Sequence, residues 1–363
     1  MTLPDVDTPA LLLDADALGR NISRMRDLVA GSGVALRPHA KTHKTPRIAK
    51  MQIEAGAAGI CCSKLAEAEV MAAGGIADIL VTTPVVGSSK IARLMQIARR
   101  ARIRVVADDP AGIDALGEAA ASAGASLDVL VEVDVGQVRC GVPPGAAAAD
   151  LAERIGDHRA LRFAGLQGYN GAIQGLADYE ERAARVRASL DLLLETAAMV
   201  RKRGFEIATL TGGGTGSSAI DLELRGLTEL QPGSYVVMDA SYAKVRGRGA
   251  DALPFERALG VLATVVSRPA SDRCVVDTGW KAVSVDSGPP LVAGHPDLLF
   301  EFAGDEHGKL RSTSGSIQLR PGDRIELIPG HCDTTINLYD DYTVMRNGRV
   351  DGLWPIETRG RTQ

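Results

Sequence analysis

Residues 37–44 contain the most reactive residue types of this chain and read Arg-Pro-His-Ala-Lys-Thr-His-Lys. They follow a short apolar run, residues 34–36, that is typical of a β-strand. A lysine amine held among cationic neighbours has a lowered pKa and can act as the nucleophile that forms a Schiff base. We therefore take Lys41 as the candidate nucleophile. The alternative is a solvated basic loop without a chemical role.

Other polar residues follow further apolar runs, each at a point where a strand would end. They are Ser63, Arg139, Tyr169, Asp239 and Tyr242. In an α/β barrel the carboxyl ends of the strands form one face, and catalytic residues collect on it. We therefore expect these side chains to meet Lys41 on one face. His39 is expected to stack on or hydrogen-bond a cofactor ring, and a packed loop histidine is the alternative.

A glycine-rich turn at residues 211–217 reads Thr-Gly-Gly-Gly-Thr-Gly-Ser and follows the seventh predicted strand. Successive glycines let the backbone approach an anion closely, and amide and hydroxyl groups can then bind it. The lysine of a Walker loop and the G-x-G-x-x-G spacing are both absent from this turn. Together with a Schiff-base lysine on the same face, the turn predicts pyridoxal 5′-phosphate (PLP) as the cofactor. The candidate phosphate contacts are Thr211, Gly213, Gly214 and Thr215.

Residues 329–333, Pro-Gly-His-Cys-Asp, predict a metal site. In an extended segment His331 and Asp333 would face the same way and Cys332 the opposite way. An imidazole with a carboxylate suits Mn²⁺, Mg²⁺ or a related divalent ion such as Zn²⁺, and leaves positions for water and a substrate oxygen. The alternative is a His–Asp hydrogen bond within a turn.

The elements that must position these residues alternate along about 220 residues. Apolar runs that read as strands occupy residues 34–36, 59–62, 79–82, 103–107, 129–133, 163–169, 207–210 and 235–238. Stretches with helical spacing lie between them, for example residues 65–73, 90–100, 112–121, 146–155 and 179–203. Eight such β/α units predict a (β/α)₈ barrel, with a doubly wound open sheet as the alternative.

The alternation of strand-like and helical stretches ends near residue 256. Residues 259–267, 273–277, 323–327 and 341–344 read as strands joined by Gly/Pro turns, which predicts a mostly antiparallel β domain. We therefore divide the α/β chain into a PLP-binding barrel, residues 15–250, and a β domain with the metal site, residues 251–363. Residues 1–14, with a strand-like run at 10–13, are expected to pair with the β domain.

Composition and charge exclude several classes of protein. The 363 residues are 45% hydrophobic and 24% charged, with a net charge of −4, which argues against a nucleic-acid or anionic-membrane partner. No apolar stretch approaches the ~18 residues of a membrane-spanning helix. Five cysteines without C-x-x-C spacing suit a reducing cytoplasm.

The motifs together resemble those of the fold-type III PLP enzymes related to alanine racemase. Within that family the chain is most similar to the metal-activated D-threonine aldolases and 3-hydroxy-D-aspartate aldolases. The similarity covers residues 7–361, nearly the whole chain. The motifs that carry it lie at residues 37–44, 59–64, 131–141, 211–217, 229–235, 305–308 and 329–333.

The resemblance implies roles for individual residues and an assembly. Lys41 carries the cofactor as a Schiff base, and Arg139 contacts the 3-oxygen of its ring. His331 and Asp333 bind the metal, and His331 is also a candidate catalytic residue. The cofactor and its phosphate are held by Tyr169, Gly214, Thr215 and Tyr242. The family usually functions as a homodimer.

Two residues depart from the aldolase pattern. Ser63 stands where the aldolases usually carry Gln, so it needs a water to reach the same cofactor atoms. Gly175 stands where they normally place the histidine that takes the proton of the substrate β-hydroxyl. The remaining candidates for that base are a metal-bound water, the neighbourhood of His331, and His307.

The resemblance predicts a carbon–carbon lyase that cleaves D-β-hydroxy-α-amino acids of the D-threonine type to glycine and an aldehyde. The nearest alternative is a D-serine or D-3-hydroxyaspartate dehydratase, which gives a 2-oxo acid and ammonia. Gly175 suits elimination, because that reaction needs no base at the β-oxygen. However, the dehydratases carry His-x-Cys at the metal site, where this chain has His331 and Asp333. A racemase, or a non-catalytic PLP carrier built from the barrel alone, agrees less well with a β domain that holds a metal pair.

Overall fold

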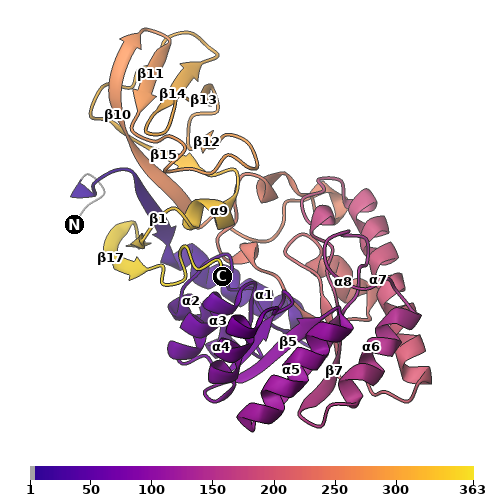
Figure 1. Cartoon of the computed structure of the whole chain (residues 1–363). Coiled ribbons are helices and arrows are strands. Elements are labelled where there is room, and N and C mark those ends of the chain that lie inside the picture. The colour runs from indigo at the N-terminus through magenta and orange to yellow at the C-terminus, as the bar shows by residue number, and fades with distance from the viewer. Residues whose placement is uncertain (1–4) are drawn as a thin grey trace.

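The computed structural model describes residues 5–363, and the part of the predicted N-terminal segment at residues 1–4 lies outside the described residues. Within residues 5–363 the strands form two sheets, one parallel and one mostly antiparallel. Figure 1 shows the parallel sheet with its helices at the bottom and the antiparallel sheet above it. None of the helices in this part of the chain is both long and apolar enough to span a bilayer.

The parallel sheet has the strand order β2-β9-β8-β7-β6-β5-β4-β3. Its strands are β2 (Ala35–Leu36), β3 (Ile60–Cys62), β4 (Asp78–Val81), β5 (Arg102–Ala107), β6 (Leu127–Glu132), β7 (Leu161–Gly168), β8 (Thr209–Gly212) and β9 (Glu229–Leu230). A parallel bridge between His39 and Cys61 joins the two ends of the sheet, with the Ala40 N–H donating to the Cys61 carbonyl at 2.8 Å. The predicted barrel is therefore confirmed, and the open doubly wound alternative is wrong.

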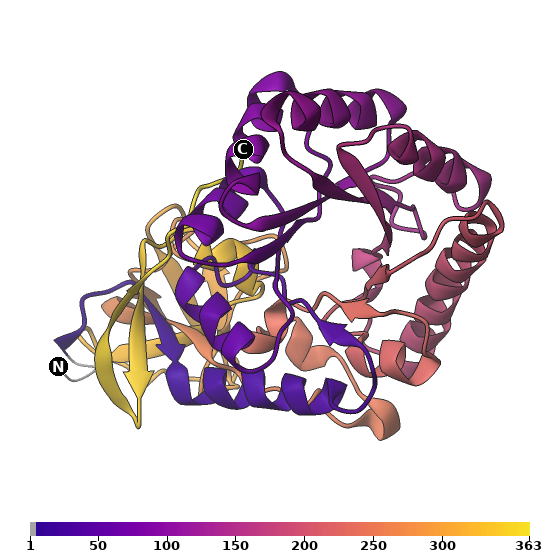
Figure 2. The same ribbon diagram turned by 90° about the horizontal axis from the view of Figure 1, so that it is seen from below.

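Helices surround this barrel, as the view from below shows (Figure 2). They are α1 (Ala15–Val29), α2 (Pro46–Glu54), α3 (Leu65–Ala73), α4 (Ser88–Ala98), α5 (Pro110–Ala123), α6 (Ala146–Gly156), α7 (Tyr179–Lys202) and α8 (Ser218–Leu224). Several begin at residues that the sequence marks as caps. For example, the side chain of Asp109 accepts the Gly112 N–H at the start of α5, which has Pro110 in its first turn.

The eighth strand was predicted at the wrong place. Residues 235–238 are not a strand; the 3₁₀ turn η3 (Ser234–Val236) occupies part of them, and the strand β9 lies a few residues earlier. The apolar residues Tyr235, Val236 and Val237 are fully buried, but they pack against α1 and the β domain rather than in the barrel sheet. A short apolar run indicates that a segment is buried, and burial alone does not distinguish a strand from a buried turn.

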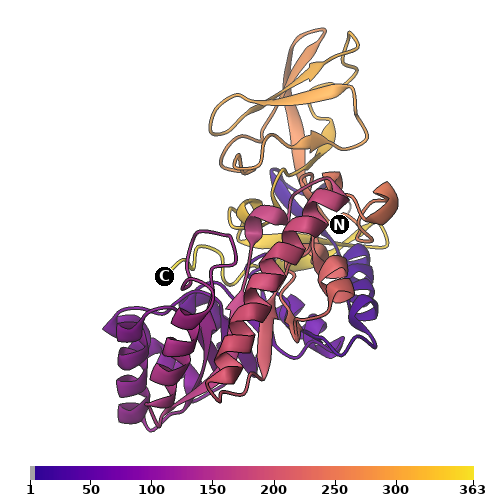
Figure 3. The same ribbon diagram turned by 90° about the vertical axis from the view of Figure 1, so that its right-hand side faces the viewer.

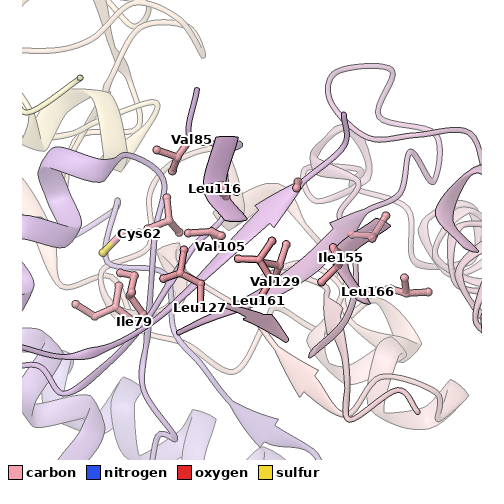
Figure 4. Close-up of a cluster of buried hydrophobic side chains, with 14 of the residues drawn as sticks. Cys62, Ile79, Val85, Val105, Leu116, Leu127, Val129, Ile155, Leu161 and Leu166 are labelled. Atoms are coloured by element: carbon pink, nitrogen blue, oxygen red, sulfur yellow. The ribbon is translucent and has the colours of Figure 1, made fainter. Parts of the chain in front are cut away.

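The hydrophobic core of the barrel lies between its strands and its helices. Figure 4 shows part of it, where Val105 and Val129 from the strands meet Leu116 and Ile155 from the helices. Cys62 points into this core, and its neighbour Cys61 points into the barrel interior. Both thiols are fully buried, and burial raises their pKa well above the usual value, so neither is a reactive group.

Inside the barrel, alternate strand residues form three layers. At the amino ends of the strands the layer is charged: the buried Arg37 pairs with Asp78 and with Glu229, each at 2.8 Å. The middle layer is apolar and consists of Cys61, Leu80, Val106 and Leu130. At the carboxyl ends the layer is polar and consists of Glu132, Gln167, Thr211 and Gln231, which are all buried. This polar layer is the floor of the candidate site, and we call it the cavity floor.

The antiparallel sheet has the order β13-β14-β11-β10-β1-β16-β17, and β15 pairs with β10 and β12. Its strands are β1 (Ala10–Asp14), β10 (Leu259–Ala270), β11 (Arg273–Val276), β12 (Leu291–Val292), β13 (Leu298–Phe302), β14 (Gly308–Ser312), β15 (Arg324–Ile328), β16 (Asp341–Arg346) and β17 (Arg349–Pro355). The strands predicted in this region coincide with β10, β11, β15 and β16, and β1 lies between β10 and β16. The part of the sheet with β11, β13 and β14 projects away from the barrel (Figures 1 and 3).

Residues far along the chain return to the loop that carries Lys41. The Tyr342 hydroxyl, from β16, donates to the His43 carbonyl at 2.8 Å. Both the amide and the hydroxyl of Thr358 donate to the Lys44 carbonyl, at 3.0 and 3.2 Å. The β domain and the segment after it therefore hold the lysine loop against the top of the barrel.

Candidate active site

A cavity of about 340 Å³ opens at the carboxyl ends of the barrel strands, and the segment at α9 (Cys332–Ile336) forms part of its wall. It has the size of a small-molecule site. The predicted site residues that line it are His39, Lys41, Ser63, Arg139, Tyr169, Gly214, Thr215, Tyr242, His331 and Asp333. The other two, Thr211 and Gly213, lie behind the wall. The structure therefore brings together residues that are separated by up to nearly 300 positions in the sequence.

Lys41 follows β2, and 38% of its side chain is exposed to the cavity. Burial lowers the pKa of its amine, but the Asp333 carboxylate, 3.9 Å away, together with Tyr169 and Glu67 raises it, and the net pKa lies above the usual value. The prediction of a lowered pKa is therefore wrong in this structure. The basic neighbours that suggested it include His39 and His43, and burial lowers the pKa of both imidazoles so that they are neutral at pH 7.

His39 has a defined tautomer. Its Nδ1 accepts the Lys41 backbone N–H at 3.4 Å, so Nε2 carries the hydrogen and donates it to the Thr82 hydroxyl at 3.1 Å. The Ser63 hydroxyl lies 3.5 Å from the same Nε2. The ring is therefore a neutral, oriented wall of the cavity beside Lys41.

The glycine-rich turn after β8 presents backbone to the cavity. A Cβ on Gly214 would lie 2.6 Å from the Gln174 side-chain oxygen, so only glycine fits there. That oxygen accepts the N–H groups of Gly216 and Ser217 and so holds the turn in shape. The Thr215 hydroxyl accepts the Tyr235 N–H at 3.0 Å, whereas its own N–H has no partner within residues 5–363. This turn can therefore donate to an anion.

Gly213 and Thr211 support this wall from behind. Gly213 has a φ of +69°, and a Cβ there would lie 2.5 Å from the Asp221 carboxylate. Thr211 is fully buried, and its hydroxyl accepts from the Gln231 amide at 2.9 Å. Neither residue lines the cavity, and their role in binding the cofactor stays a prediction.

Arg139 lies at the end of a loop that winds around Asp134. One carboxylate oxygen of Asp134 accepts the N–H groups of both Gly136 and Val138, at 2.9 and 3.0 Å. The guanidinium carbon of Arg139 lies 5.7 Å from the centre of the Tyr169 ring, and no carboxylate in the described chain pairs with it. Arg139 is therefore a cation that faces the cavity and can bind an acidic oxygen.

His331 and Asp333 both line the cavity, but their segment is not extended as predicted. His331 is the N-cap of α9, and Asp333 lies in the first turn of that helix. Helical geometry still places both side chains on the cavity side, and Cys332 points away and is fully buried. Among residues 5–363 no group of three or more His, Cys, Asp or Glu side chains is arranged around one metal position. The candidate metal site therefore rests on two protein ligands.

Asp286, which the sequence analysis missed, orients His331. Its carboxylate contacts His331 Nδ1 at 2.5 Å and accepts the Thr334 hydroxyl at 2.7 Å. Burial lowers the pKa of His331, but Asp333 and Asp286 raise it by more, so the net pKa lies above the usual value. Because Nδ1 is occupied, Nε2 is the nitrogen left to bind a ligand. A carboxylate behind a histidine is the usual arrangement at metal sites, so the residues present fit a divalent ion.

Asp239 connects the barrel end to α9 from beneath. Its two carboxylate oxygens accept the N–H groups of Tyr242 and Cys332, at 2.8 and 2.9 Å. Asp239 is 2% exposed, and burial raises its pKa. It therefore fixes the distance between the cofactor-side residue Tyr242 and the segment with His331 and Asp333.

The positions of Gly175 and His307 bear on which group could take the proton of the substrate β-hydroxyl. Gly175 lines the cavity, and a Cβ built on it has no atom within 4 Å, so the place of a side chain is open space. His307 is exposed between β13 and β14 and does not line the cavity. His307 is therefore not positioned to act as the base.

Comparisons with known proteins decide the family. Residues 13–241 match the family model "Alanine racemase, N-terminal domain". The chain belongs to this family. Residues 258–345 also match the model "Putative serine dehydratase domain". The predicted resemblance to the alanine racemase-like PLP enzymes is therefore confirmed.

Two curated relatives and two solved structures are similar over nearly the whole chain. A D-threonine aldolase from Arthrobacter sp. is 43% identical and covers 99% of this chain and 94% of its own length. A 3-hydroxy-D-aspartate aldolase from Paracoccus denitrificans is 38% identical and covers 98% and 93%. The crystal structure of a D-threonine aldolase from Filomicrobium marinum is 44% identical, has a TM-score of 0.97 and covers 99% and 98%. A D-threo-3-hydroxyaspartate dehydratase from Delftia sp. HT23 is 27% identical, with a TM-score of 0.85 and 98% coverage of both chains.

Proposed function

We propose that this chain is a PLP- and divalent-metal-dependent carbon–carbon lyase that cleaves D-β-hydroxy-α-amino acids of the D-threonine type to glycine and an aldehyde. The observation that carries the proposal is the single cavity that Lys41 shares with His331 and Asp333. One wall offers an amine for a Schiff base and the other offers metal ligands. The similarity to aldolases over the full chain supports the same reaction.

The cavity fits PLP, because each of its functional groups finds a matching wall. Lys41 would bind the aldehyde carbon, Arg139 the 3-oxygen, and the turn at Gly214 and Thr215 the phosphate. Tyr169, Tyr242, His39 and Ser63 line the same cavity and would also contact the cofactor. PLP supplies an electron sink for the pair of electrons released when the Cα–Cβ bond breaks. The residues around the cavity would bind the cofactor and orient it.

His331 Nε2 and the Asp333 carboxylate are the proposed metal ligands, and Mn²⁺ or Mg²⁺, or alternatively Zn²⁺, fits an imidazole and a carboxylate. A divalent ion there would lower the pKa of a substrate hydroxyl. Asp333 also lies 3.9 Å from Lys41 Nζ, so the ligand wall and the amine wall are adjacent. The contact of His331 Nδ1 with Asp286 fixes the orientation of the imidazole.

The second candidate function is a D-serine or D-3-hydroxyaspartate dehydratase that gives a 2-oxo acid and ammonia. The open space at Gly175 favours it, because no side chain at that position can take a proton from the β-oxygen. Similarity favours the aldolase, since the dehydratase of known structure is less similar than the aldolase of known structure. We therefore keep the aldolase as the proposal.

An assay of products separates the two reactions. We expect purified protein with PLP and Mn²⁺ to convert D-threonine to glycine and acetaldehyde, and to lose this activity in EDTA. Formation of 2-oxobutanoate and ammonia instead would contradict the aldolase. L-Threonine is the control for the configuration at the α-carbon.

A variant pair tests the lysine. Lys41→Ala should abolish turnover, and borohydride reduction should no longer attach the cofactor to the peptide with residue 41, as measured by mass spectrometry. Lys64→Ala is the matched control, because Lys64 is a nearby exposed lysine outside the cavity. Cofactor attachment at Lys64 or at another lysine in the wild type would contradict the proposed site.

We also propose a cytoplasmic homodimer that acts on small amino-acid substrates and has no nucleic-acid or membrane partner. The acidic net charge supports the absence of a nucleic-acid partner. Light scattering on the eluted holoenzyme measures the assembly, and a mass of one chain would contradict the dimer.

A further inference from the structure

The cavity floor contains a chain of buried amides that the sequence analysis did not identify. Glu132, Gln167 and Gln231 project upward from β6, β7 and the end of β9, and each is at most 4% exposed. Gln167 and Gln231 line the cavity directly. Because an amide has a donating end and an accepting end, the hydrogen bonds beneath the floor decide which end the cavity meets.

The orientation of Gln167 is fixed by a backbone carbonyl. Its Nε2 lies 3.4 Å from the Thr82 carbonyl oxygen and also contacts the Glu132 carboxyl at 2.5 Å. A carbonyl can only accept, so the end of Gln167 that faces Thr82 must be the NH₂ group. The other end, Oε1, is therefore an acceptor directed at Gln231.

The orientation of Gln231 follows from that of Gln167. Its Nε2 donates to Gln167 Oε1 and to the Thr211 hydroxyl, both at 2.9 Å. These two bonds use both hydrogens of the Gln231 amide. Its Oε1 then remains as an acceptor, and no group within residues 5–363 donates to it.

The cavity therefore has two walls of opposite hydrogen-bonding character. Gln231 offers only an acceptor, whereas Arg139 offers only donors and carries a positive charge. PLP has two polar positions on its ring besides its anchored groups, the 3-oxygen and the ring nitrogen. The 3-oxygen is an acceptor, so it pairs with Arg139 and is repelled by Gln231 Oε1. An unprotonated ring nitrogen is also an acceptor and would face another acceptor on the floor.

We propose that Gln231 is a cofactor-binding residue that selects the N-protonated form of the PLP ring. The inference rests on the cofactor named in the proposed function and goes beyond it, because it assigns a protonation state and the residue that sets it. A protonated ring withdraws electrons more strongly than a neutral ring. Gln231 thereby favours the charge that develops at the substrate α-carbon.

Glu132 completes this arrangement from below. Burial raises its pKa to about 8, and the hydrogen bond from Gln167 opposes that shift. Near pH 8 Glu132 is therefore close to its ionisation midpoint. It lies two hydrogen bonds away from Gln231. A cation on the floor favours its ionised form, so the two charges stabilise each other.

The test measures the protonation state of the PLP ring nitrogen. Holoenzyme reconstituted with PLP that carries ¹⁵N in the ring should give the ¹⁵N NMR shift of a pyridinium from pH 7 to 8.5. A shift typical of an unprotonated pyridine in the wild-type protein would overturn the inference. This readout needs no turnover. If PLP does not bind at Lys41, the proposed function fails; if it binds with an unprotonated nitrogen, only the present inference fails.

Variants separate Gln231 from the rest of the cavity. Gln231→Arg replaces the acceptor with donors, and we expect the ring nitrogen to lose its proton. Thr83→Ala removes a hydroxyl from another part of the cavity lining that has no assigned cofactor contact, and the ¹⁵N shift should stay that of a pyridinium. If Gln231→Arg does not fold, binding of 1-deaza-PLP to wild-type apoenzyme gives the answer, because that analogue has a carbon in place of the nitrogen. We expect it to bind at least about tenfold more weakly than PLP, and equal binding would contradict the inference.

Discussion

At the scale of single residues, the cavity depends on partners that fix where polar atoms point. The Asp286 carboxylate contacts His331 Nδ1, and Gln167 Oε1 accepts a hydrogen bond from the Gln231 amide. Such oriented groups lose little freedom when a ligand binds, so the site is preorganised. The exception is Gly175, where the cavity wall has open space instead of a side chain.

The open space at Gly175 predicts that a histidine can be added there. Gly175→His should fold with a melting temperature close to that of the wild type, because a Cβ meets no atom within 4 Å. An imidazole at this position supplies a base, so we expect kcat for D-threonine cleavage to rise by roughly tenfold or more, with a new acidic limb, on which activity falls as the pH drops below the usual histidine pKa of ~6.5. Gly175→Gln, which has similar bulk and no base, is the control. An equal rise in both variants would show that filling the space, rather than proton transfer, is responsible.

Glu132 predicts a dependence of stability on pH. In the unfolded chain its carboxyl loses its proton near pH 4.5, but in the folded protein it keeps the proton until about pH 8. Between these values the folded state binds the extra proton, so this group's contribution to stability falls as the pH rises. Glu132→Gln keeps a neutral acceptor for Gln167 and removes the titration. We expect the difference in the free energy of unfolding, variant minus wild type, to rise by roughly 1–3 kcal/mol between pH 5 and pH 8.

Urea unfolding of apoenzyme at several pH values measures this difference. The comparison cancels all other titrating groups, because they are common to the two proteins. A constant difference across this pH range would show that Glu132 is ionised in the folded protein.

At the scale of elements, local sequence predicted the bounds of helices and strands better than it predicted the charged layer inside the barrel. The helices at 65–73 and 179–202 were predicted almost to the residue, because helical spacing and caps are local signals. The last barrel strand was misplaced, because the strand is only two residues long and a longer apolar run follows it. The pairing of Arg37 with Asp78 and Glu229 joins three different strands, and no local pattern contains it.

The charged layer predicts a large loss of stability on substitution. Arg37→Met leaves the Glu229 carboxylate buried with only Arg104, at 3.7 Å, as a cationic partner. Breaking a buried ion pair by removing one partner costs about 3–5 kcal/mol in the free energy of unfolding. Arg20→Ala is the control, because the Arg20–Glu256 pair is exposed to solvent and is expected to contribute little to stability. Similar losses for both variants in urea unfolding would contradict the role of the charged layer.

At the scale of the whole molecule, the active site lies where the barrel meets the α9 segment that follows β15, and neither part contains it alone. The sequence predicted many of the residues that line the cavity, because most of them follow strand ends. It gave the wrong direction for the pKa of Lys41, since the carboxylate that raises it, Asp333, comes from the other end of the chain. Gln167 and Gln231 were not identified as functional in the sequence analysis, and Asp239 was expected on the same face but not as a support, because these roles depend on contacts between strands and domains.

Asp239 predicts a coupling between the two parts. Asp239→Ala leaves the buried N–H groups of Tyr242 and Cys332 without an acceptor and frees the α9 segment from the barrel. We expect Mn²⁺ affinity, measured by electron paramagnetic resonance, to fall by about 10- to 100-fold, as it does when a support behind a metal ligand is lost. PLP attachment to Lys41 should persist. Asp305→Ala, at an exposed position of the β domain, is the control, and equal Mn²⁺ affinity in both variants would contradict the coupling.

The hydrogen bonds that hold the Lys41 loop also determine when, during synthesis of the chain, the active site can form. The His43 and Lys44 carbonyls receive their donors from Tyr342 and Thr358, which are 299 and 314 residues further along the chain. While a ribosome is still completing the barrel, the nucleophilic lysine exists but its loop has no such support, and His331 and Asp333 have not been synthesised. We therefore expect the nascent barrel to remain cofactor-free, and a single late event, the docking of the β domain, to convert the new polypeptide into one that can retain PLP.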